Sequence, residues 1–171
     1  MKKIAVFAGS FDPFTLGHLD VVKRAAALFD TLWVVVAQNA NKKNMFDCIA
    51  RASMVKTAVA GVVNVKVAVH EGLTVDFMKS VGATYLVRGV RGAADLEFEQ
   101  TVAWNNKTLF ADAETVLLLS APEHLSISSS VVRELLNCDE GATPASQKKI
   151  LSKFVPLAIV AELLKLSEKL K

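Results

Sequence analysis

The chain has 171 residues, of which 52% are hydrophobic and 22% charged, and its formal net charge at pH 7 is +3. This composition excludes a disordered chain, and the length suits one domain over 1–171 with a sizeable buried core. The mild positive charge gives no reason to expect a nucleic-acid partner, whereas it suits anionic small molecules.

The two cysteines, Cys48 and Cys138, stand apart and form no C-x-x-C motif, so reduced thiols are expected instead of a disulfide framework. Lys2 and Lys3 precede an apolar segment as in a signal peptide, but that segment ends by Ala8, which is too short for an export core. No run approaches the ~18 apolar residues of a membrane span. We therefore expect a cytoplasmic protein without a membrane partner.

The chain opens with a strand, a turn and a helix. The apolar run Ile4–Ala8 predicts a buried strand, and apolar residues at helical spacing predict a helix that begins near Gly17 and His18. The intervening loop is rich in glycine and proline, which permit tight turns and close approach to a ligand. Free amides at a helix N-terminus favour negative charge, so this unit predicts an anion site with His18 beside it.

Strands and helices alternate along the rest of the chain. Apolar runs predict four further strands at Leu32–Ala37, Val63–Val69, Thr84–Val87 and Glu114–Leu119. Helical spacing predicts helices at Asp47–Ala60, Leu73–Val81, Ala94–Phe110, Ser128–Leu136, Gln147–Lys153 and Pro156–Leu170, with a turn region at Glu140–Ser146 before the last two. This alternation indicates an α/β, doubly wound, Rossmann-like domain: a five-stranded parallel sheet with helices on both faces and a helical C-terminal extension over about 147–170.

Polar clusters follow the predicted strands. They are Gly9–His18 after the first strand, Lys42 after the second, Arg88–Arg91 after the fourth and Ser128–Ser130 beyond the fifth. Ligands of doubly wound sheets bind outside the carboxyl ends of the strands, near the point where the strand order reverses. The four clusters are therefore expected to meet in one cleft.

The first turn lacks G-x-G-x-x-G, and the chain lacks G-x-x-x-x-G-K-[ST], which argues against an NAD-type site and a P-loop. It carries instead Thr15-Leu16-Gly17-His18, with Ile127-Ser128-Ser129-Ser130 near the far end. This pair resembles the signature of the nucleotidylyltransferase superfamily, [HT]-x-G-H with a later serine-rich helix start.

Three further clusters narrow the resemblance: Arg88-Gly89-Val90-Arg91, Asp95-Leu96-Glu97-Phe98-Glu99, and Lys42. Together they resemble the bacterial phosphopantetheine adenylyltransferase family, collinearly from about Lys3 to Arg133. The resemblance implies transfer of the adenylyl group of ATP to 4′-phosphopantetheine, giving dephospho-coenzyme A and pyrophosphate in coenzyme A biosynthesis. It also implies Mg²⁺ held mainly by the ATP phosphates, without a protein metal site, and a homohexamer.

The same resemblance implies roles for individual residues. The catalytic residues would be His18, which stabilises the transition state, with Lys42 and Arg91. The acceptor would be bound by Ser10, Lys42, Thr74 and Arg88. ATP would be bound by Ser10, Phe11, His18, Gly89, Val90, Arg91, Glu99, His124, Leu125, Ser126, Ile127, Ser128, Ser129 and Ser130, with Glu99 accepting from ribose or orienting an arginine. His124 and Ser126 depart from the aromatic residues common in the family, which affects packing against adenine.

Several structural alternatives stand beside these roles. Arg88 and Arg91 could pair with Asp95 and Glu99 only to hold the fold, and Ser128–Ser130 is at minimum a helix cap. His70 and His124 are expected on the surface or in loops. The apolar side of the tail, which contains Leu157, Val160, Leu163 and Leu164, could pack on its own core or on a neighbouring subunit.

Two rival functions remain open. One is a sister transferase that uses nicotinate mononucleotide or a cytidylyl donor, against which the Arg88–Arg91 cluster and the triple serine argue. The other is a non-catalytic coenzyme A or nucleotide sensor. The intact His18 and Lys42, with Arg88 and Arg91, argue against it.

Overall fold

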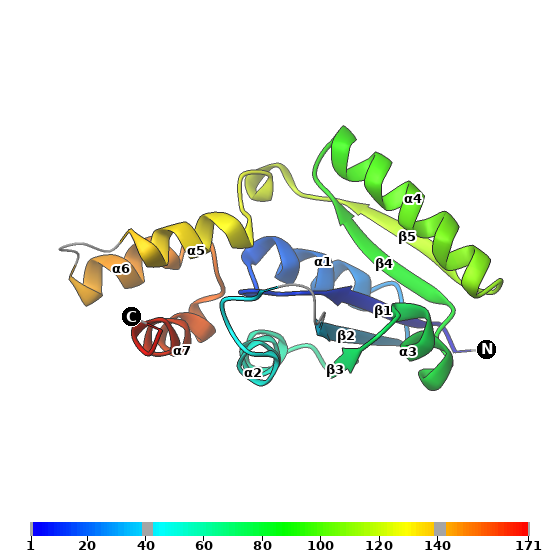
Figure 1. The fold of residues 1–171 in the computed structure, drawn as a ribbon, viewed down its shortest axis with the longest axis horizontal. Coiled ribbons are helices and arrows are strands. Elements are labelled where there is room, and N and C mark those ends of the chain that lie inside the picture. The colour runs from blue at the N-terminus through cyan, green and yellow to red at the C-terminus, as the bar shows by residue number, and fades with distance from the viewer. Residues whose placement is uncertain (1, 39–42, 139–142, 171) are drawn as a thin grey trace.

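The computed structural model describes residues 2–38, 43–138 and 143–170. Their strands form a five-stranded parallel sheet in the order β3-β2-β1-β4-β5 (Figure 1). The strands are β1 (Ile4–Gly9), β2 (Thr31–Gln38), β3 (Val65–Glu71), β4 (Tyr85–Val90) and β5 (Glu114–Leu119). The expected doubly wound fold is confirmed, and the strand order reverses between β1 and β4.

Helices follow the strands as the periodicity predicted. They are α1 (Leu16–Ala26), α2 (Cys48–Val59), α3 (Thr74–Val81), α4 (Ala93–Leu109), α5 (Ser129–Asn137), α6 (Pro144–Leu151) and α7 (Leu157–Glu168), with a short 3₁₀ turn η1 (Pro122–His124). Within the described ranges, no helix combines the length and the apolar character needed to cross a bilayer.

Two predicted boundaries, the end of β4 and the start of α6, were wrong by three residues. β4 runs three residues further than expected, because Arg88, Gly89 and Val90 continue to pair with the neighbouring strand β5. Helix α6 begins at Pro144 instead of Gln147, because the Thr143 side chain caps it by accepting a hydrogen bond from the Ser146 N–H, and proline is well suited to a first helical position.

The two faces of the sheet pack into separate cores. On β1, Ala5 and Phe7 belong to a cluster that also contains buried residues of α1 and α2, whereas Val6 and Ala8 join Met78 of α3 on the other face. Each of these five residues is at most 5% exposed. This alternation is what a strand buried on both sides requires.

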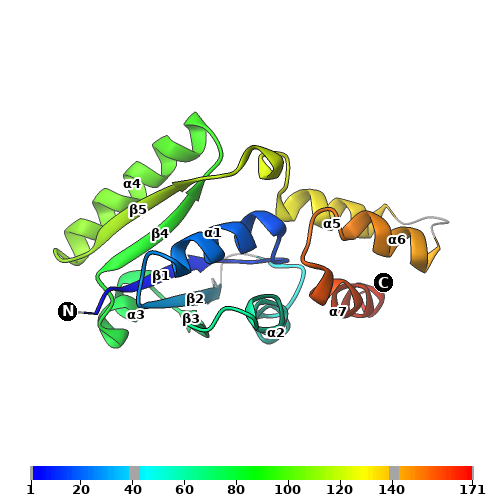
Figure 2. The ribbon, with the colours of Figure 1, turned by 180° about the vertical axis from the view of Figure 1, so that it is seen from behind.

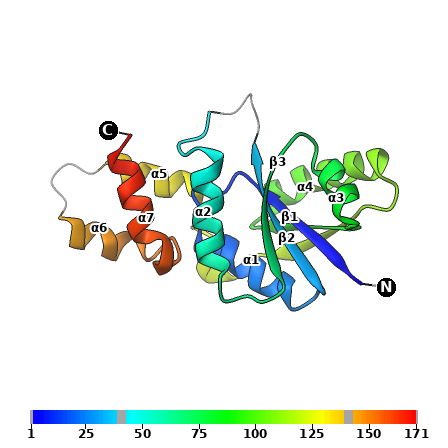
Figure 3. The ribbon, with the colours of Figure 1, turned by 90° about the horizontal axis from the view of Figure 1, so that it is seen from below.

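Helices α5, α6 and α7 form a group at the end of the molecule opposite the N-terminus (Figures 1 and 2). Figure 3 shows α2 between this group and the strands, and α2 packs against α7. Val160 and Leu163 of α7 are fully buried in the same cluster as β1, whereas Leu157 is 67% exposed. Most of the apolar side of the tail therefore packs on the chain's own core.

Leu163→Ala should test this packing of α7. Removing a fully buried leucine side chain should lower the free energy of unfolding by about 2–5 kcal/mol. Leu157→Ala on the same helix is the matched control and should change it by no more than about 0.5 kcal/mol. Urea unfolding followed by circular dichroism measures both, and equal effects would contradict the described packing.

Candidate active site

A cavity of about 470 Å³ opens at the carboxyl ends of β1 and β4, where the strand order reverses. Its walls come from the loop after β1, the end of β4, the start of α4, the segment after β5 and the start of α5. The polar and charged lining residues are Ser10, Asp12, Thr15, His18, Lys43, Arg88, Arg91, Asp95, Glu99, Ser120, His124, Ser128, Ser129, Ser130 and Arg133. Clusters that are distant in the sequence thus share one cleft.

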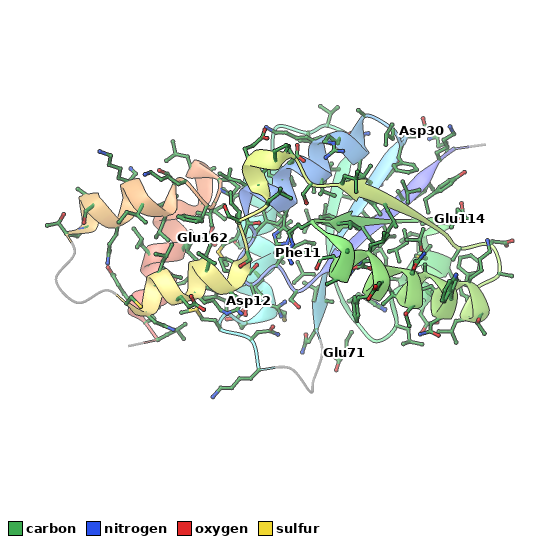
Figure 4. The ribbon with its side chains drawn as sticks, turned by 90° about the horizontal axis from the view of Figure 1, so that it is seen from above. Phe11, Asp12, Asp30, Glu71, Glu114 and Glu162 are labelled. Carbon is green, nitrogen blue, oxygen red and sulfur yellow. The ribbon has the colours of Figure 1, made fainter. Side chains whose placement is uncertain are left out.

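The loop after β1 is held in a strained turn. Phe11 has a φ of 48°, a left-handed conformation that is costly for a residue other than glycine. Its buried ring packs against Phe7 at 5.3 Å and Phe14 at 5.4 Å between centroids, which holds the turn. A Cβ at Gly9 would lie 3.0 Å from the Phe11 ring, so a larger residue there would push this ring out of its place. Figure 4 shows Phe11 and Asp12 together where this loop meets α5.

His18 closes a capping box at the start of α1. The Thr15 side chain accepts a hydrogen bond from the His18 N–H at 3.3 Å, and the Thr15 N–H donates to His18 Nδ1 at 3.0 Å. The imidazole thereby takes the place that glutamate or glutamine usually holds in this motif. Because Nδ1 accepts, the ring proton of the neutral imidazole lies on Nε2, which leaves an N–H donor for the cavity.

His18 is neutral at physiological pH. Burial among aromatic rings, with Phe11 at 5.1 Å and edge-on, together with the positive charges of Arg91 and Arg88, lowers the pKa of His18 from 6.5 to about 4. The site therefore places a hydrogen-bond donor, instead of an additional cation, beside its arginines.

Arg88 is fixed by three hydrogen bonds. Its Nε and Nη2 donate to the two carboxylate oxygens of Glu99 at 2.7 and 2.6 Å, and its Nη1 donates to the Ala8 carbonyl at 2.7 Å. Glu99 is 6% exposed, so this bidentate pair is largely shielded from water. Of the two expectations for Glu99, the structure shows the orientation of an arginine.

Arg91 pairs with Asp95 at the start of α4. Both its backbone N–H and its Nε donate to Asp95 Oδ2, at 3.1 and 3.0 Å. Desolvation alone would raise the pKa of Asp95, but these hydrogen bonds and the Arg91 charge outweigh it and lower that pKa. Both expected arginine–carboxylate pairs are present, and both arginines line the cavity.

The serine cluster forms the start of α5. Ser128 is the N-cap and accepts from the Val131 N–H at 3.3 Å, and Ser129 Oγ donates to the Pro13 carbonyl at 2.8 Å. Sequence reasoning missed Arg133, which donates to Ser130 Oγ at 3.0 Å and to the Asp12 carbonyl at 2.7 Å. The helical spacing could have indicated this role, because Arg133 stands three positions after Ser130 and so lies on the same face of the helix.

Some predicted residues lie elsewhere. Lys42 falls outside the described residues, and its neighbour Lys43 lines the cavity. The cavity lining as described includes neither Thr74, at the start of α3, nor the three residues Val90, Leu125 and Ser126. His124 does line it, and its buried Nδ1 has no hydrogen-bond partner within the described chain.

His70 is partly exposed in an edge strand of the sheet, so it is near the surface as expected but not in a loop. It lies in β3, half-buried, with Nε2 3.0 Å from the Leu73 carbonyl and its ring packed on Phe77. Strand β3 extends two residues beyond its predicted end, which takes His70 into the sheet. It has no contact with the cavity.

The carboxylates around the cavity are already engaged. Asp12 accepts from the Met45 and Phe46 N–H groups, Glu99 accepts from Arg88 and Asp95 accepts from Arg91. Within residues 2–38, 43–138 and 143–170, no group of three or more His, Cys, Asp or Glu side chains is arranged to hold a metal ion.

Comparison with known proteins agrees with this geometry. Residues 6–135 match the cytidylyltransferase-like family. The chain is 46% identical over 160 residues to a phosphopantetheine adenylyltransferase of Leuconostoc mesenteroides, covering 94% of this chain and 93% of that one, and 48% identical over 133 residues to that of Limosilactobacillus reuteri, covering 78% and 77%.

Among solved structures, the fold resembles Plasmodium falciparum nicotinic acid mononucleotide adenylyltransferase complexed with NaAD. The TM-score is 0.66 at 20% identity, with 98% of each chain covered, and this likeness concerns the fold alone. The identities to the bacterial relatives extend over most of both chains. The chain belongs to the phosphopantetheine adenylyltransferase family.

Proposed function

We propose that this chain catalyses the transfer of the adenylyl group of ATP to 4′-phosphopantetheine, giving dephospho-coenzyme A and pyrophosphate. The observation that carries the proposal is the 46% identity to a phosphopantetheine adenylyltransferase over 94% of the chain. The cavity supports it, because a donor at a helix N-terminus, several arginines and a serine-rich helix start are groups that bind phosphates.

In the proposed reaction, a phosphate oxygen of the acceptor attacks the α-phosphorus of ATP in line. The new P–O bond forms as the bond from the α-phosphorus to the β-phosphate oxygen breaks, and pyrophosphate leaves with both bonding electrons. Such transfers depend on positioning and charge stabilisation and need no protein nucleophile. The neutral Nε2–H of His18 would donate to an α-phosphate oxygen as negative charge increases there.

The remaining groups would hold the two substrates. Arg88, oriented by Glu99, keeps unused N–H donors and would bind the acceptor phosphate together with Lys42. Arg91 would act on the nucleotide, while Ser129 and Ser130 with Arg133 would bind the β- and γ-phosphates at the start of α5. Thr74 would contact the pantetheine arm.

Mg²⁺ is the proposed cofactor and would bind mainly through the ATP phosphates, because Asp12, Asp95 and Glu99 are each engaged by N–H donors. When bound, it would neutralise charge on the pyrophosphate leaving group.

We also propose that the chain forms a homohexamer. The number of copies follows from the family resemblance. Helix α4 exposes large apolar side chains along its length, which contact with a second copy would bury. These are Leu96, Phe98, Trp104 and Leu109, which are 40–67% exposed. Sedimentation equilibrium should give six times the chain mass, and a monomer would refute this assembly.

Pyrophosphate release is the test of the proposed reaction. With ATP and Mg²⁺, release should depend on added 4′-phosphopantetheine, and mass spectrometry should identify dephospho-coenzyme A as the product. Nicotinate mononucleotide as acceptor and CTP as donor are the controls for the sister activities. ATP binding without release under any of these conditions would instead indicate a nucleotide sensor.

His18→Ala should lower kcat by about 10²–10³-fold, the usual loss for removing one donor that stabilises transition-state charge, about 2.7–4 kcal/mol. The Kd for ATP should stay within about threefold of wild type, because one neutral donor contributes little to ground-state binding. Steady-state kinetics and calorimetry measure the two effects. Unchanged turnover would remove His18 from the mechanism.

The lowered pKa of His18 should also make stability depend on pH. The unfolded chain has a histidine pKa near 6.5 and binds this proton more readily than the folded chain, whose pKa is about 4. Stability from this group is therefore complete above pH 6.5 and is lost as the pH falls towards 4. Urea unfolding at pH 7 and pH 5 should show a larger loss for wild type than for His18→Ala, and equal losses would contradict the shift.

A further inference from the structure

Arg51 is a buried cation that the mechanism above does not use. It lies in α2, is 1% exposed and is not among the residues that line the cavity. Its side chain donates to three backbone carbonyls from three segments: Phe46 by Nε at 3.0 Å, and Ser10 and Ala37 by Nη1 at 2.5 and 3.1 Å. One guanidinium thus ties the loop after β1 to the end of β2 and to the start of α2.

Among the residues that the structure describes, the charge of Arg51 has no carboxylate partner. Within the described ranges, no Asp or Glu oxygen lies within 4.0 Å of its guanidinium, whereas Arg88 and Arg91 each pair with a carboxylate. A buried cation without a counter-ion is costly, and carbonyl dipoles offset only part of that cost. The guanidinium therefore keeps its net positive charge, and the buried surroundings screen this charge only weakly.

Ser10 connects this charge to the cavity. Ser10 lines the cavity and its carbonyl accepts from Arg51, which does not line it, so we place the guanidinium one peptide unit behind the cavity wall. A cation on a peptide carbonyl polarises the following N–H, which here belongs to Phe11. No hydrogen bond between described residues uses the Phe11 N–H.

We propose that Arg51 is a positioning residue for phosphate binding: its guanidinium sets the Ser10–Phe11 turn and supplies, from behind the cavity wall, positive charge that a bound phosphate group neutralises. The inference rests on the proposed function only for the choice of ATP as probe. The role differs from that of Arg88 and Arg91, because Arg51 acts through the backbone and touches no substrate.

Neutral variants of Arg51 test the proposal. Arg51→Met removes charge and donors, and Arg51→Gln keeps an N–H donor without the charge. Each should weaken ATP binding by about tenfold or more, the effect of losing one charge near an anion in weakly screening surroundings. Arg51→Lys, which keeps a charge but loses the planar fork, should bind ATP more tightly than either. Calorimetry, well below the melting temperature of each variant, measures Kd.

Met54→Ala is the matched control for stability. Met54 is fully buried in the same helix, so its truncation lowers the melting temperature without changing charge. It should bind ATP with wild-type affinity. If Arg51 were only structural, Arg51→Met and Arg51→Gln would behave in the same way, with a lower melting temperature and an unchanged Kd, and the proposal would be overturned.

Arg51→Lys supplies a second readout that does not require the neutral variants to fold. A buried ammonium loses its proton more readily than arginine does, so ATP affinity of this variant should fall between pH 7 and about 10, relative to wild type. An identical pH dependence in both proteins would contradict the proposal.

If wild type binds no ATP, the proposed function fails, and inorganic pyrophosphate then replaces ATP as the probe for Arg51. If wild type does not bind pyrophosphate either, the proposed role of Arg51 is overturned.

Discussion

The hydrogen bond from the Thr15 N–H to His18 Nδ1 is the constraint on which the site depends. It fixes the ring of His18 at the start of α1, and it leaves Nε2 as the nitrogen that carries the proton. Without it, either nitrogen could be protonated and the ring could turn. The turn that provides this N–H is itself held by Phe11, whose ring packs against Phe7, Phe14 and His18.

Positive charge around the cavity is arranged in two ways. Arg88 and Arg91 are oriented by Glu99 and Asp95, so their direction is set before a ligand arrives. Arg51, in our proposal, acts from behind the wall through the Ser10 carbonyl. Burial, with the charges of Arg91 and Arg88, lowers the pKa of His18 and keeps it neutral. The result is a site that suits phosphates and needs little rearrangement to bind them.

The fold and the meeting of the clusters could be predicted from sequence because both follow from short-range patterns. Apolar runs such as Leu32–Ala37 and Glu114–Leu119 predict strands, and the order of strands and helices then predicts which loops share an edge of the sheet. The structure confirms the fold, the meeting of the clusters that follow β1, β4 and β5, and the cap that Ser128 provides for α5, whereas Lys42 lies outside the described residues.

What could not be predicted depends on contacts between distant residues. The sequence left two roles for Glu99, and only the fold brings its carboxylate to Arg88. Arg51 looks like an ordinary polar position of a helix until the fold places three carbonyls around it. The tautomer of His18 is likewise a matter of backbone geometry, which residue types alone do not determine.

The protonation state of His18 is the most direct test of this account. Two-bond ¹H–¹⁵N NMR spectra of the histidine rings, with His18→Ala to assign its signals, should be recorded from pH 5 to pH 8. The account predicts a proton on Nε2 alone and no titration in this range, because the pKa of His18 is about 4. A proton on Nδ1, or a titration midpoint near the ordinary histidine value of about 6.5, would contradict it.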